Sequence, residues 1–370
     1  MPGDKSIGHR ALLLASLAEG ASTLRGVSPG GDNRSTRAAL EILGVSFRDE
    51  LGALTVEGRG LDGLCAPARP LDCGNSGTSL RLLAGVLVAQ PFASRLTGDA
   101  SLSRRPMGRV TRPLRGRGAR IEGVIDPARR DEVPPLDIKG LGESKRLFEL
   151  EHELPVASAQ VKSALLLSGL WADGSTSLRE PTLSRDHTER MLLAQGVPLQ
   201  TMGPLVFLDP SAWSRRLAPL DLDVPGDPSS AAFFVVAAHL VPGSRVAARG
   251  VCTNPTRTGF LEVLRDQGGG AVIDPKGEAA AEPVGDLHVG LAGTGELRRG
   301  ARVGGELAVR SIDEIPALVA AAACAPGESH FRDLAELRVK ESDRVAALVA
   351  LVRAFGLDAE AHPDGLSVRG

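Results

Sequence analysis

Five stretches of the chain share one pattern, which constrains the fold more than any single motif does. Each opens with a small polar or charged cluster, continues as a helix rich in Ala, Leu and Val, and closes on Gly and small residues. Most are followed by a strand-like run and a second helix that ends in Gly. The openings are Lys5 and Ser6, residues 75–78, residues 158–160, Ser229 and Ser230, and Asp313 and Glu314. Self-similarity on this scale predicts a repeat architecture.

The repeats divide into two related lobes. Residues 224–227 (VPGD) echo residues 2–4 (PGD) near the start of the chain. We therefore predict a first lobe of three repeats at 1–222 and a second lobe of two repeats at 223–370. A third repeat of the second lobe would begin beyond Gly370, so we expect this lobe to be incomplete and the chain to be a fragment or a truncated product.

The helical segments predict the layers of each lobe. They hold continuous apolar runs, such as residues 11–18 (ALLLASLA) and 231–238 (AAFFVVAA). A helix that is apolar on nearly every side is buried, so each lobe should hold parallel helices surrounded by sheet. Short β-branched or alternating runs between them predict strands. These runs are residues 22–27, 53–58, 176–181, 205–210, 245–251, 287–291, 306–311 and 366–370. The fold class is α/β (α+β).

Composition excludes several classes of function. A length of 370 residues with 42% hydrophobic content supports two packed domains. A net charge of −2, 3% aromatic residues and no Tyr argue against nucleic-acid or anionic-membrane partners. The apolar runs are too short to span a bilayer, and the first ten residues lack an apolar signal core. We therefore expect a cytoplasmic protein.

Two groups of residues have a plain structural interpretation. Cys65, Cys73, Cys252 and Cys324 show no CxxC or Cys/His spacing, so we expect reduced thiols and no metal site. Most of the basic run at residues 104–120 is interpreted as a solvated helix face, with Arg105 as the exception.

The helix openings are candidate anion sites. Every helix start leaves unpaired N–H groups and a partial positive charge. Lys5, Ser6 and Arg10 lie near the first opening, Arg81 follows residues 75–78 by one turn, and residues 158–160 supply a hydroxyl and an amide. Ordinary N-capping explains any one opening. Four openings in parallel repeats, three of them with nearby cations, favour a site for a polyanion.

A second cluster has acid–base potential. Asp313 and Glu314 begin an apolar helix, and residues 340–344 (KESDR) begin the next one. A carboxylate beside ammonium and guanidinium groups can act as a base or a proton donor. A salt-bridged, solvated helix face is the alternative interpretation of residues 340–344 taken alone.

Seven stretches, in order along the chain, resemble the 5-enolpyruvylshikimate-3-phosphate synthase family. They are residues 2–10 (PGDKSIGHR), 74–81 (GNSGTSLR), 102–110 (LSRRPMGRV), 157–163 (ASAQVKS), 184–190 (SRDHTER), 311–316 (SIDEIP) and 337–344 (LRVKESDR). The resemblance implies two lobes of βαβαββ-type repeats that close over the substrates. It implies transfer of the carboxyvinyl group of phosphoenolpyruvate to the 5-hydroxyl of shikimate-3-phosphate, with release of phosphate. No metal or organic cofactor is implied, and we expect a monomer.

The resemblance also implies a role for each matched residue. Shikimate-3-phosphate would be bound by Lys5, Ser6, Arg10, Ser158, Ala159, Gln160, Ser184, Asp313 and Lys340. Phosphoenolpyruvate would be bound by Lys5, Asn75, Gly77, Arg105, Gln160 and Arg344. For catalysis, Asp313 would take the proton of the 5-hydroxyl and Glu341 would protonate the methylene carbon. Lys340 would lie near that hydroxyl, and Lys5 would bridge both substrates.

Other functions stay open at this point. Members of this family usually carry a sixth repeat with an Asp-His-Arg element that helps to bind phosphoenolpyruvate, and this sequence has none. A catalytically impaired ligand-binding fragment, or an assembly module that uses only the first lobe, is therefore an alternative.

Two other enzyme classes share parts of the pattern. UDP-N-acetylglucosamine enolpyruvyl transferase shares the fold and the chemistry, but it has a GAKN-type first helix and a reactive Cys five residues before its Arg-Pro. Ala100 stands at that place relative to Arg105 here. RNA 3′-phosphate cyclases share the repeat style, but neutral charge and scarce aromatic residues argue against them.

Overall fold

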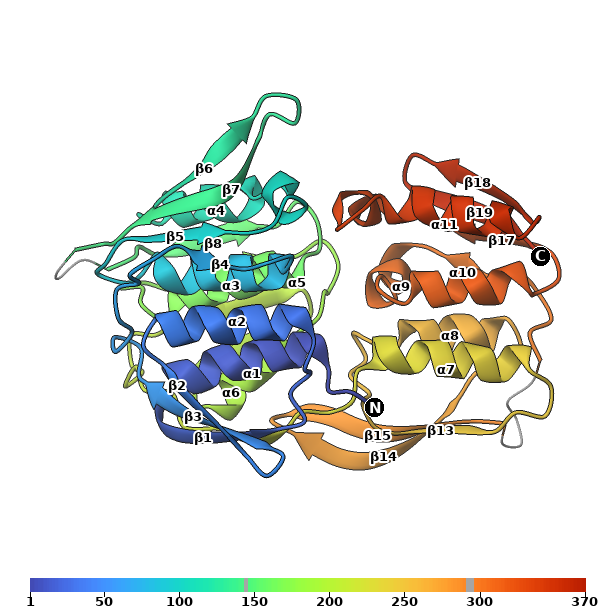
Figure 1. The fold of residues 1–370 in the computed structure, drawn as a ribbon, viewed down its shortest axis with the longest axis horizontal. Coiled ribbons are helices and arrows are strands. Elements are labelled where there is room, and N and C mark those ends of the chain that lie inside the picture. Colours follow the sequence, from blue (N-terminus) through green and yellow to red (C-terminus); the bar gives the residue numbers. More distant parts are fainter. Residues whose placement is uncertain (143–145, 291–295) are drawn as a thin grey trace. The chain divides into compact units, whose positions relative to one another are not determined.

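The chain forms two compact units in a computed structural model that describes residues 1–142, 146–290 and 296–370 (Figure 1). Lys5–Val224 forms the N-terminal unit, and Met1–Asp4 with Pro225–Gly370 forms the C-terminal unit. The first lobe predicted at residues 1–222 included residues 1–4, but these four residues belong to the C-terminal unit. Gly3 forms a β-bridge with Gly226, and the Asp4 amide donates to the Pro225 carbonyl at 2.7 Å. The chain thus passes between the units twice.

The described part of the N-terminal unit holds three sheets of four strands, with the orders β12-β1-β3-β2, β4-β5-β7-β6 and β8-β9-β11-β10. In each sheet the first strand pairs parallel with the second, and the other pairs are antiparallel. The strands are β1 (Glu19–Arg25), β2 (Ser46–Glu50), β3 (Ala53–Arg59), β4 (Leu71–Asp72), β5 (Ser94–Thr97), β6 (Arg120–Asp126), β7 (Asp131–Lys139), β8 (Leu150–Glu153), β9 (Thr176–Arg179), β10 (Leu199–Met202), β11 (Leu205–Leu208) and β12 (Asp221–Asp223). This common topology is the structural form of the sequence repeat.

Two sets of helices accompany these sheets. The first helices of the repeats are α1 (Lys5–Leu17), α3 (Gly77–Leu87) and α5 (Ala159–Gly169), and they are buried along almost their whole length. The second helices are α2 (Gly31–Ile42), α4 (Gly108–Gly116) and α6 (His187–Ala194), and a 3₁₀ turn, η1, spans Leu102–Arg104. Figure 1 shows the helices stacked in layers within the unit. Burial of α1, α3 and α5 confirms the prediction from their apolar runs.

The C-terminal unit repeats this plan in the residues that the structure describes. One sheet has three strands, β13 (Val246–Cys252), β15 (Glu282–Val289) and β14 (Val272–Ala279). The other has four, β16 (Arg302–Val303), β17 (Glu328–Phe331), β19 (Gly365–Arg369) and β18 (Asp358–His362). The helices are α7 (Pro228–Leu240), α8 (Gly259–Asp266), α9 (Gly305–Arg310), α10 (Ile315–Ala323) and α11 (Arg344–Ala354), with a 3₁₀ turn, η2, at Ala335–Val339. Among the described helices of both units, none combines the length and the apolar character needed to cross a bilayer.

Glycines end the second helices where the repeat pattern predicts. The five glycines have positive φ and are Gly44, Gly118, Gly196, Gly268 and Gly356. They follow α2, α4, α6, α8 and α11 by two residues. A residue in the left-handed region commonly closes a helix, and Gly adopts it without steric cost.

One predicted strand is wrong, because residues 306–311 belong mainly to helix α9. The Gly305 amide donates to Asp333 Oδ2 at 2.7 Å, which anchors the helix start, and Ala308 is buried. Six residues are too few for alternation to distinguish strand from helix. In the predicted strand at 287–291, β15 ends at Val289, and Leu291 lies outside the described residues.

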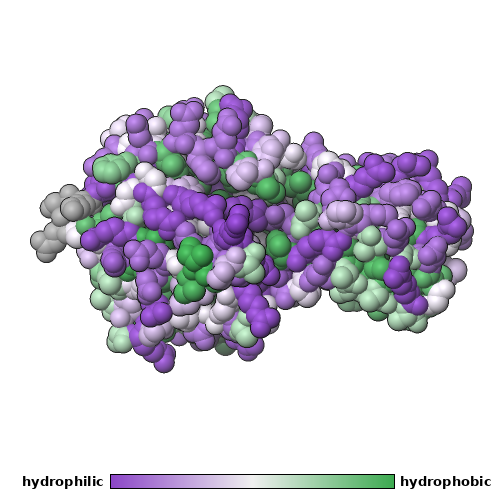
Figure 2. All heavy atoms as spheres, turned by 90° about the horizontal axis from the view of Figure 1, so that it is seen from above, coloured by the Kyte–Doolittle hydropathy of each residue, from purple (hydrophilic) through white to green (hydrophobic). Residues whose placement is uncertain are grey.

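Helix α7 is not buried on every side, which corrects the expectation for its apolar run. Phe233 and Phe234 are 56% and 58% exposed, whereas Val235 and Val236 are buried. The helix packs against α10 and against β13 and β15. These partners cover only part of its circumference, and Figure 2 shows hydrophobic side chains (green) gathered on one side of the C-terminal unit.

Arg117 contradicts the interpretation of residues 104–120 as a solvated face. It is fully buried, and its guanidinium donates to the carbonyls of Phe148 and Leu165 and to the hydroxyls of Ser168 and Thr176. Burial lowers the pKa of Arg117 to about 10. The side chain thereby joins α4 to α5 and β9.

Candidate active site

The residues predicted to form the site fall into two groups, one in each unit. The N-terminal unit contains Lys5, Ser6, Arg10, Asn75, Gly77, Arg105, Ser158, Ala159, Gln160 and Ser184. The C-terminal unit contains Asp313, Lys340, Glu341 and Arg344. Most members of both groups lie at or just before a helix start, where backbone N–H groups lack intrahelical partners.

The start of α1 carries an exposed cation. Lys5 is the first residue of the helix, its side chain is 48% exposed, and its Nζ lies 3.0 Å from Asp32 Oδ2 on α2. The hydroxyl of Ser6 accepts a hydrogen bond from Arg185 Nη1 at 3.4 Å. Asp32 thus holds the Lys5 ammonium beside the helix start.

Arg10, one turn later, is a buried connector. Its Nε donates to Thr188 Oγ1 at 2.6 Å, Nη1 to the Ser6 carbonyl at 2.9 Å, and Nη2 to Ser163 Oγ at 2.7 Å. Because Ser163 lies on α5 and Thr188 on α6, one guanidinium joins three helices. Arg10 therefore fixes the start of α1 relative to α5 and α6.

The starts of α3 and α5 are joined directly. Ser76 caps α3 by accepting the Ser79 amide at 3.1 Å. Gln160, in the first turn of α5, accepts from Arg81 Nη1 at 2.6 Å and donates to Thr78 Oγ1 at 2.8 Å. Arg81 also donates to the carbonyls of Gly77 and Pro106. Gln160 and Gly77, predicted from separate motifs, therefore belong to one hydrogen-bonded group.

Arg105 is largely buried and is hydrogen-bonded to Asn75. Its Nη2 donates to Asn75 Oδ1, and Asn75 Nδ2 donates to Asp99 Oδ2 at 2.6 Å. Hydrogen bonds from the Leu102 amide and from Asn75 lower the pKa of Asp99. This chain of contacts places Arg105 next to Gly77, since a Cβ at Gly77 would lie 3.1 Å from Arg105 Nη1.

Ser158 and Ser184 meet at a carboxylate that the sequence did not suggest. Ser158 caps α5 by accepting from the Val161 amide. The Ser158 amide and the Ser184 hydroxyl both donate to Glu180 Oε1, at 3.1 and 2.6 Å. These two residues of the predicted site are therefore neighbours.

The C-terminal group is a chain of alternating charges between the starts of α10 and α11. Asp313 Oδ1 lies 3.7 Å from Lys340 Nζ and 3.3 Å from Arg344 Nη1. Arg344 Nη2 in turn lies 2.7 Å from Glu341 Oε2. Asp343 caps α11 by accepting the Ala346 amide, which fixes the backbone of this segment. All four predicted residues of this unit are thus brought together.

Glu314, the neighbour of Asp313, faces a different, buried cluster around Arg257. Arg257 Nη1 lies 2.5 Å from Asp4 Oδ2, and Nη2 lies 3.1 Å from Asp227 Oδ1 and 3.6 Å from Glu314 Oε1. Ser229 donates to Glu314 and accepts from Arg257. Burial alone would lower the pKa of Arg257, but the three carboxylates raise it well above its ordinary value. The cluster connects residues 4 and 227 to the start of α10.

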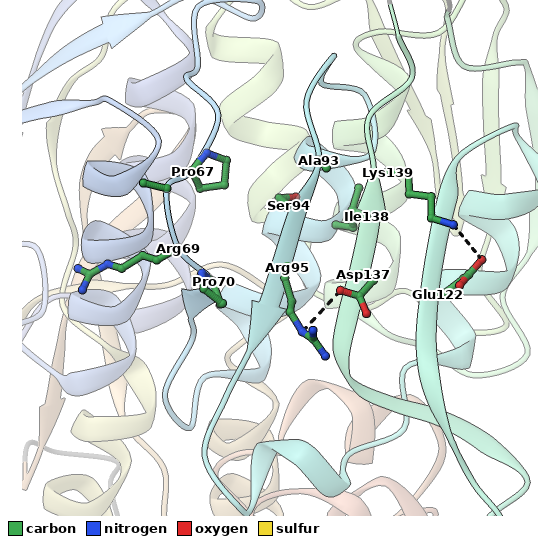
Figure 3. Close-up of a pocket in the computed structure, with 11 residues that line it drawn as sticks. Pro67, Arg69, Pro70, Ala93, Ser94, Arg95, Glu122, Asp137, Ile138 and Lys139 are labelled. Atoms are coloured by element: carbon green, nitrogen blue, oxygen red, sulfur yellow. Dashed lines mark ion pairs between the residues drawn. The ribbon is translucent and has the colours of Figure 1, made fainter.

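A surface pocket lies apart from these groups. It is lined by residues 67–70, which precede β4, by Ala93, and by β5, β6 and β7 (Figure 3). Four of its five charged residues form ion pairs, Arg95 with Asp137 at 3.5 Å and Lys139 with Glu122 at 4.0 Å. No residue of the predicted site lines it.

One cluster of the described residues has the spacing of metal ligands. Asp274, Asp286 and His288 lie on β14 and β15 with their ligand atoms within 4.8 Å of one another. Lys276 Nζ lies 2.6 Å from Asp274 Oδ2 and 3.9 Å from Asp286 Oδ2. The Lys276 ammonium therefore offsets part of the negative charge of the two carboxylates.

The residues that sequence reasoning missed are mainly carboxylates that hold the predicted ones. Asp32 holds Lys5, Asp99 holds Asn75, and Glu180 holds Ser158 and Ser184. Each of Asp32 and Asp99 lies more than 20 residues from its partner, so no local spacing marks the pair. For Glu180, its place four residues before Ser184 was the available signal.

This arrangement suits anionic ligands and proton transfer. The N-terminal group offers helix-start N–H groups, hydroxyls and the cations of Lys5 and Arg105. The C-terminal group offers carboxylates next to cations, which can accept or donate a proton at the position of a bound anion.

Comparison with known proteins gives one consistent family. Residues 1–370 match the family model described as EPSP synthase (3-phosphoshikimate 1-carboxyvinyltransferase). A protein of that name from Herpetosiphon aurantiacus is 48% identical over 370 residues, with 100% of this chain and 83% of the relative covered. One from Pelobacter propionicus is 45% identical, with 100% and 82% covered. The solved EPSP synthase from Acinetobacter baumannii has a TM-score of 0.83 at 41% identity, covering 100% of this chain and 80% of that one.

Proposed function

Because this chain belongs to the EPSP synthase (3-phosphoshikimate 1-carboxyvinyltransferase) family, we propose that it transfers the carboxyvinyl group of phosphoenolpyruvate to the 5-hydroxyl of shikimate-3-phosphate. The products are 5-enolpyruvylshikimate-3-phosphate and phosphate, in the biosynthesis of aromatic amino acids. The observation that carries the proposal is the family match over residues 1–370. The contacts of Asp313 with Lys340 and Arg344 support it, because they place a base among cations.

The proposed binding roles follow the two groups of residues. Ser6, Ser158, Ala159, Gln160 and Ser184 hold shikimate-3-phosphate through hydroxyls, an amide and helix-start N–H groups. Arg10 is assigned to the same substrate, and its guanidinium joins the start of α1 to Ser163 and Thr188.

Cations take the other substrate. Arg105 and Arg344 bind phosphoenolpyruvate as planar forks that match carboxylate and phosphate oxygens. Asn75, Gly77 and Gln160 also bind phosphoenolpyruvate. Lys5 contributes a positive charge to the binding of both substrates.

The proton transfers balance with two carboxyl groups. Asp313 accepts the proton of the 5-hydroxyl as that oxygen bonds to C2 of phosphoenolpyruvate, and Glu341 donates a proton to C3. Loss of phosphate from C2 and return of a proton from C3 to Glu341 then restore the double bond, and the proton on Asp313 leaves with the phosphate. Lys340 stabilises negative charge near the reacting oxygen.

The direct test is phosphate release by the 370-residue chain with both substrates. We expect phosphate only when shikimate-3-phosphate and phosphoenolpyruvate are both present, with the enolpyruvyl product identified by mass. Heat of binding for shikimate-3-phosphate without turnover would favour the alternative, a ligand-binding fragment with impaired catalysis. If the folded protein showed no binding and no turnover, the proposal would be refuted.

Gly77 provides a second prediction. A Cβ at this position would lie 2.8 Å from Arg81 Nη1 and 3.1 Å from Arg105 Nη1, so both guanidinium groups must move. We expect Gly77→Ala to raise the KM for phosphoenolpyruvate by about tenfold, since overpacking costs about 1–3 kcal/mol. Inhibition by glyphosate, which the family resemblance places in the same site, should weaken as well. Equal KM and equal inhibition of the two forms would contradict the placement of Gly77. Gly116→Ala is the control, because a Cβ there meets nothing within 4 Å.

A further inference from the structure

A buried ion cluster lies beside the start of α5. Lys162 Nζ is 2.7 Å from Glu180 Oε2 and 2.7 Å from Glu189 Oε1, and the three side chains are at most 2% exposed. Burial alone would lower the pKa of Lys162, but the carboxylates of Glu189 and Glu180 outweigh burial and raise it. With all three groups ionised, the cluster carries one surplus negative charge. The proposed reaction uses none of these residues.

The carboxylate of Glu180 has a full set of donors. Oε1 accepts from the Ser158 amide at 3.1 Å and the Ser184 hydroxyl at 2.6 Å. Oε2 accepts from the Ser184 amide at 3.1 Å and from Lys162 Nζ at 2.7 Å. A carboxylate has about four lone-pair sites, so Glu180 is saturated. Lys162 fixes this carboxylate, and the carboxylate fixes two backbone amides and one hydroxyl.

Glu189 differs from Glu180 in one respect that matters. It reaches Lys162 from α6, but among the described contacts no hydrogen bond joins it to Ser158 or Ser184. The two carboxylates therefore share burial, charge and a cation, and only Glu180 touches the serines.

A surplus negative charge beside a phosphate site weakens phosphate binding through space. Electrostatics alone therefore gives no reason to keep Glu180 at this place. Its three hydrogen bonds with Ser158 and Ser184 give a geometric reason, because they hold these residues from separate segments at one carboxylate. Serine hydroxyls bind a phosphate well only when their oxygens are already in position.

We propose that Glu180 is a positioning residue that holds Ser158 and Ser184 for the phosphate group of shikimate-3-phosphate. The inference rests on the proposed function, since it takes these serines as the holders of shikimate-3-phosphate. A bound phosphate competes with Glu180 for the single proton of Ser184, and the Ser184 amide stays on Glu180 throughout. Lys162 keeps the carboxylate in place during this exchange.

The test compares Glu180→Gln with Glu189→Gln. Each substitution removes one negative charge from the same buried cluster and leaves Lys162 paired with the other carboxylate. We expect Glu180→Gln to raise both the KM and the Kd for shikimate-3-phosphate by about tenfold, since hydrogen bonds to a charged group are lost. The KM for phosphoenolpyruvate and kcat at saturating shikimate-3-phosphate should stay within about twofold. Glu189→Gln should leave the affinity for shikimate-3-phosphate unchanged or improve it.

The outcomes separate this inference from the proposed function. If the unchanged chain neither binds nor turns over shikimate-3-phosphate, the proposed function fails, and the inference fails with it. If the unchanged chain binds it and Glu180→Gln binds equally well, only the inference fails. An equal loss in both variants would show a charge or folding effect, and would also overturn the positioning role.

A second variant covers the case in which Glu180→Gln does not fold, as judged by its thermal melt. Ser184→Ala leaves the ion cluster and the Ser158 contact intact, and it should raise the KM for shikimate-3-phosphate several-fold. An unchanged KM would then refute the inference. Where both variants fold, the double variant should lose less affinity than the product of the two single losses, because Glu180 acts partly through Ser184.

Discussion

Asp313→Asn is expected to lower kcat by about 10²–10⁴-fold while the protein still binds shikimate-3-phosphate. An amide keeps the size of the carboxyl group but cannot take the proton of the 5-hydroxyl, and general base catalysis contributes about this much. The substitution also removes the negative charge that lies 3.7 Å from Lys340 Nζ and 3.3 Å from Arg344 Nη1. Steady-state phosphate release gives kcat, and titration calorimetry gives the affinity.

Asp333→Asn is the matched control for this substitution. Asp333 lies in the same unit and accepts the Gly305 amide through Oδ2, outside the group around Asp313. Its φ of 60° suits Asn as well as Asp. We expect its kcat to match that of the unchanged chain. Turnover by Asp313→Asn at the unchanged rate would remove Asp313 as the base, and Asp313→Ala should then also be active.

Arg257→Met is expected to destabilise the C-terminal unit by about 3–5 kcal/mol. Breaking a buried ion pair by removal of one partner costs about this much, because the remaining charge stays buried without compensation. Three carboxylates surround this guanidinium, and the side chains of Asp4 and Glu314 have no exposed area. The loss should also disturb the start of α10, where Glu314 is the neighbour of Asp313.

Hydrogen exchange resolved by peptide measures this loss in the unit concerned. Amides of residues 225–370 should exchange faster in Arg257→Met, while those of residues 5–224 keep their rates. Both Trp residues, Trp171 and Trp213, lie in the N-terminal unit, so their fluorescence reports on that unit alone. Arg265→Met, at an exposed position in the last turn of α8, should leave exchange unchanged. Unaltered protection in Arg257→Met would contradict a stabilising role for the cluster.

Local signals in the sequence predicted the repeat plan well. Apolar runs marked α1, α3 and α5, and glycines marked the ends of α2, α4, α6, α8 and α11, because burial and left-handed backbone depend on nearby residues. The strand predicted at residues 306–311 was wrong, because a six-residue pattern is compatible with both strand and helix.

Features that depend on distant partners were beyond the sequence. The exposed face of α7 depends on which elements pack against the helix. The apolar sequence of the helix does not specify these packing partners. Arg117 lies in a charged stretch, yet its guanidinium is buried because it donates hydrogen bonds to acceptors on α5 and β9. In the sequence, nothing distinguishes Glu180 from other acidic residues, because its contacts with Lys162 and the two serines form only in the folded chain.

The site itself was accessible from sequence only as a set of helix starts. Anion-binding chemistry at Lys5 and at residues 75–78 and 158–160 follows from charge and capping, but the individual roles came from the family resemblance. The contacts of Lys340 and Arg344 with Asp313 and of Gln160 with Arg81 place these residues in two groups.

The double passage of the chain between the units has a consequence for biosynthesis. Lys5–Val224 is contiguous and can fold on the ribosome as soon as its last strand emerges. Met1–Asp4, made before it, must wait for partners made after it, because Asp4 binds Arg257 and Gly3 pairs with Gly226. Gly3 and Asp4 therefore remain without these partners while Lys5–Val224 is synthesised. The C-terminal unit can therefore complete the contacts of Asp4 only after Arg257 has been synthesised.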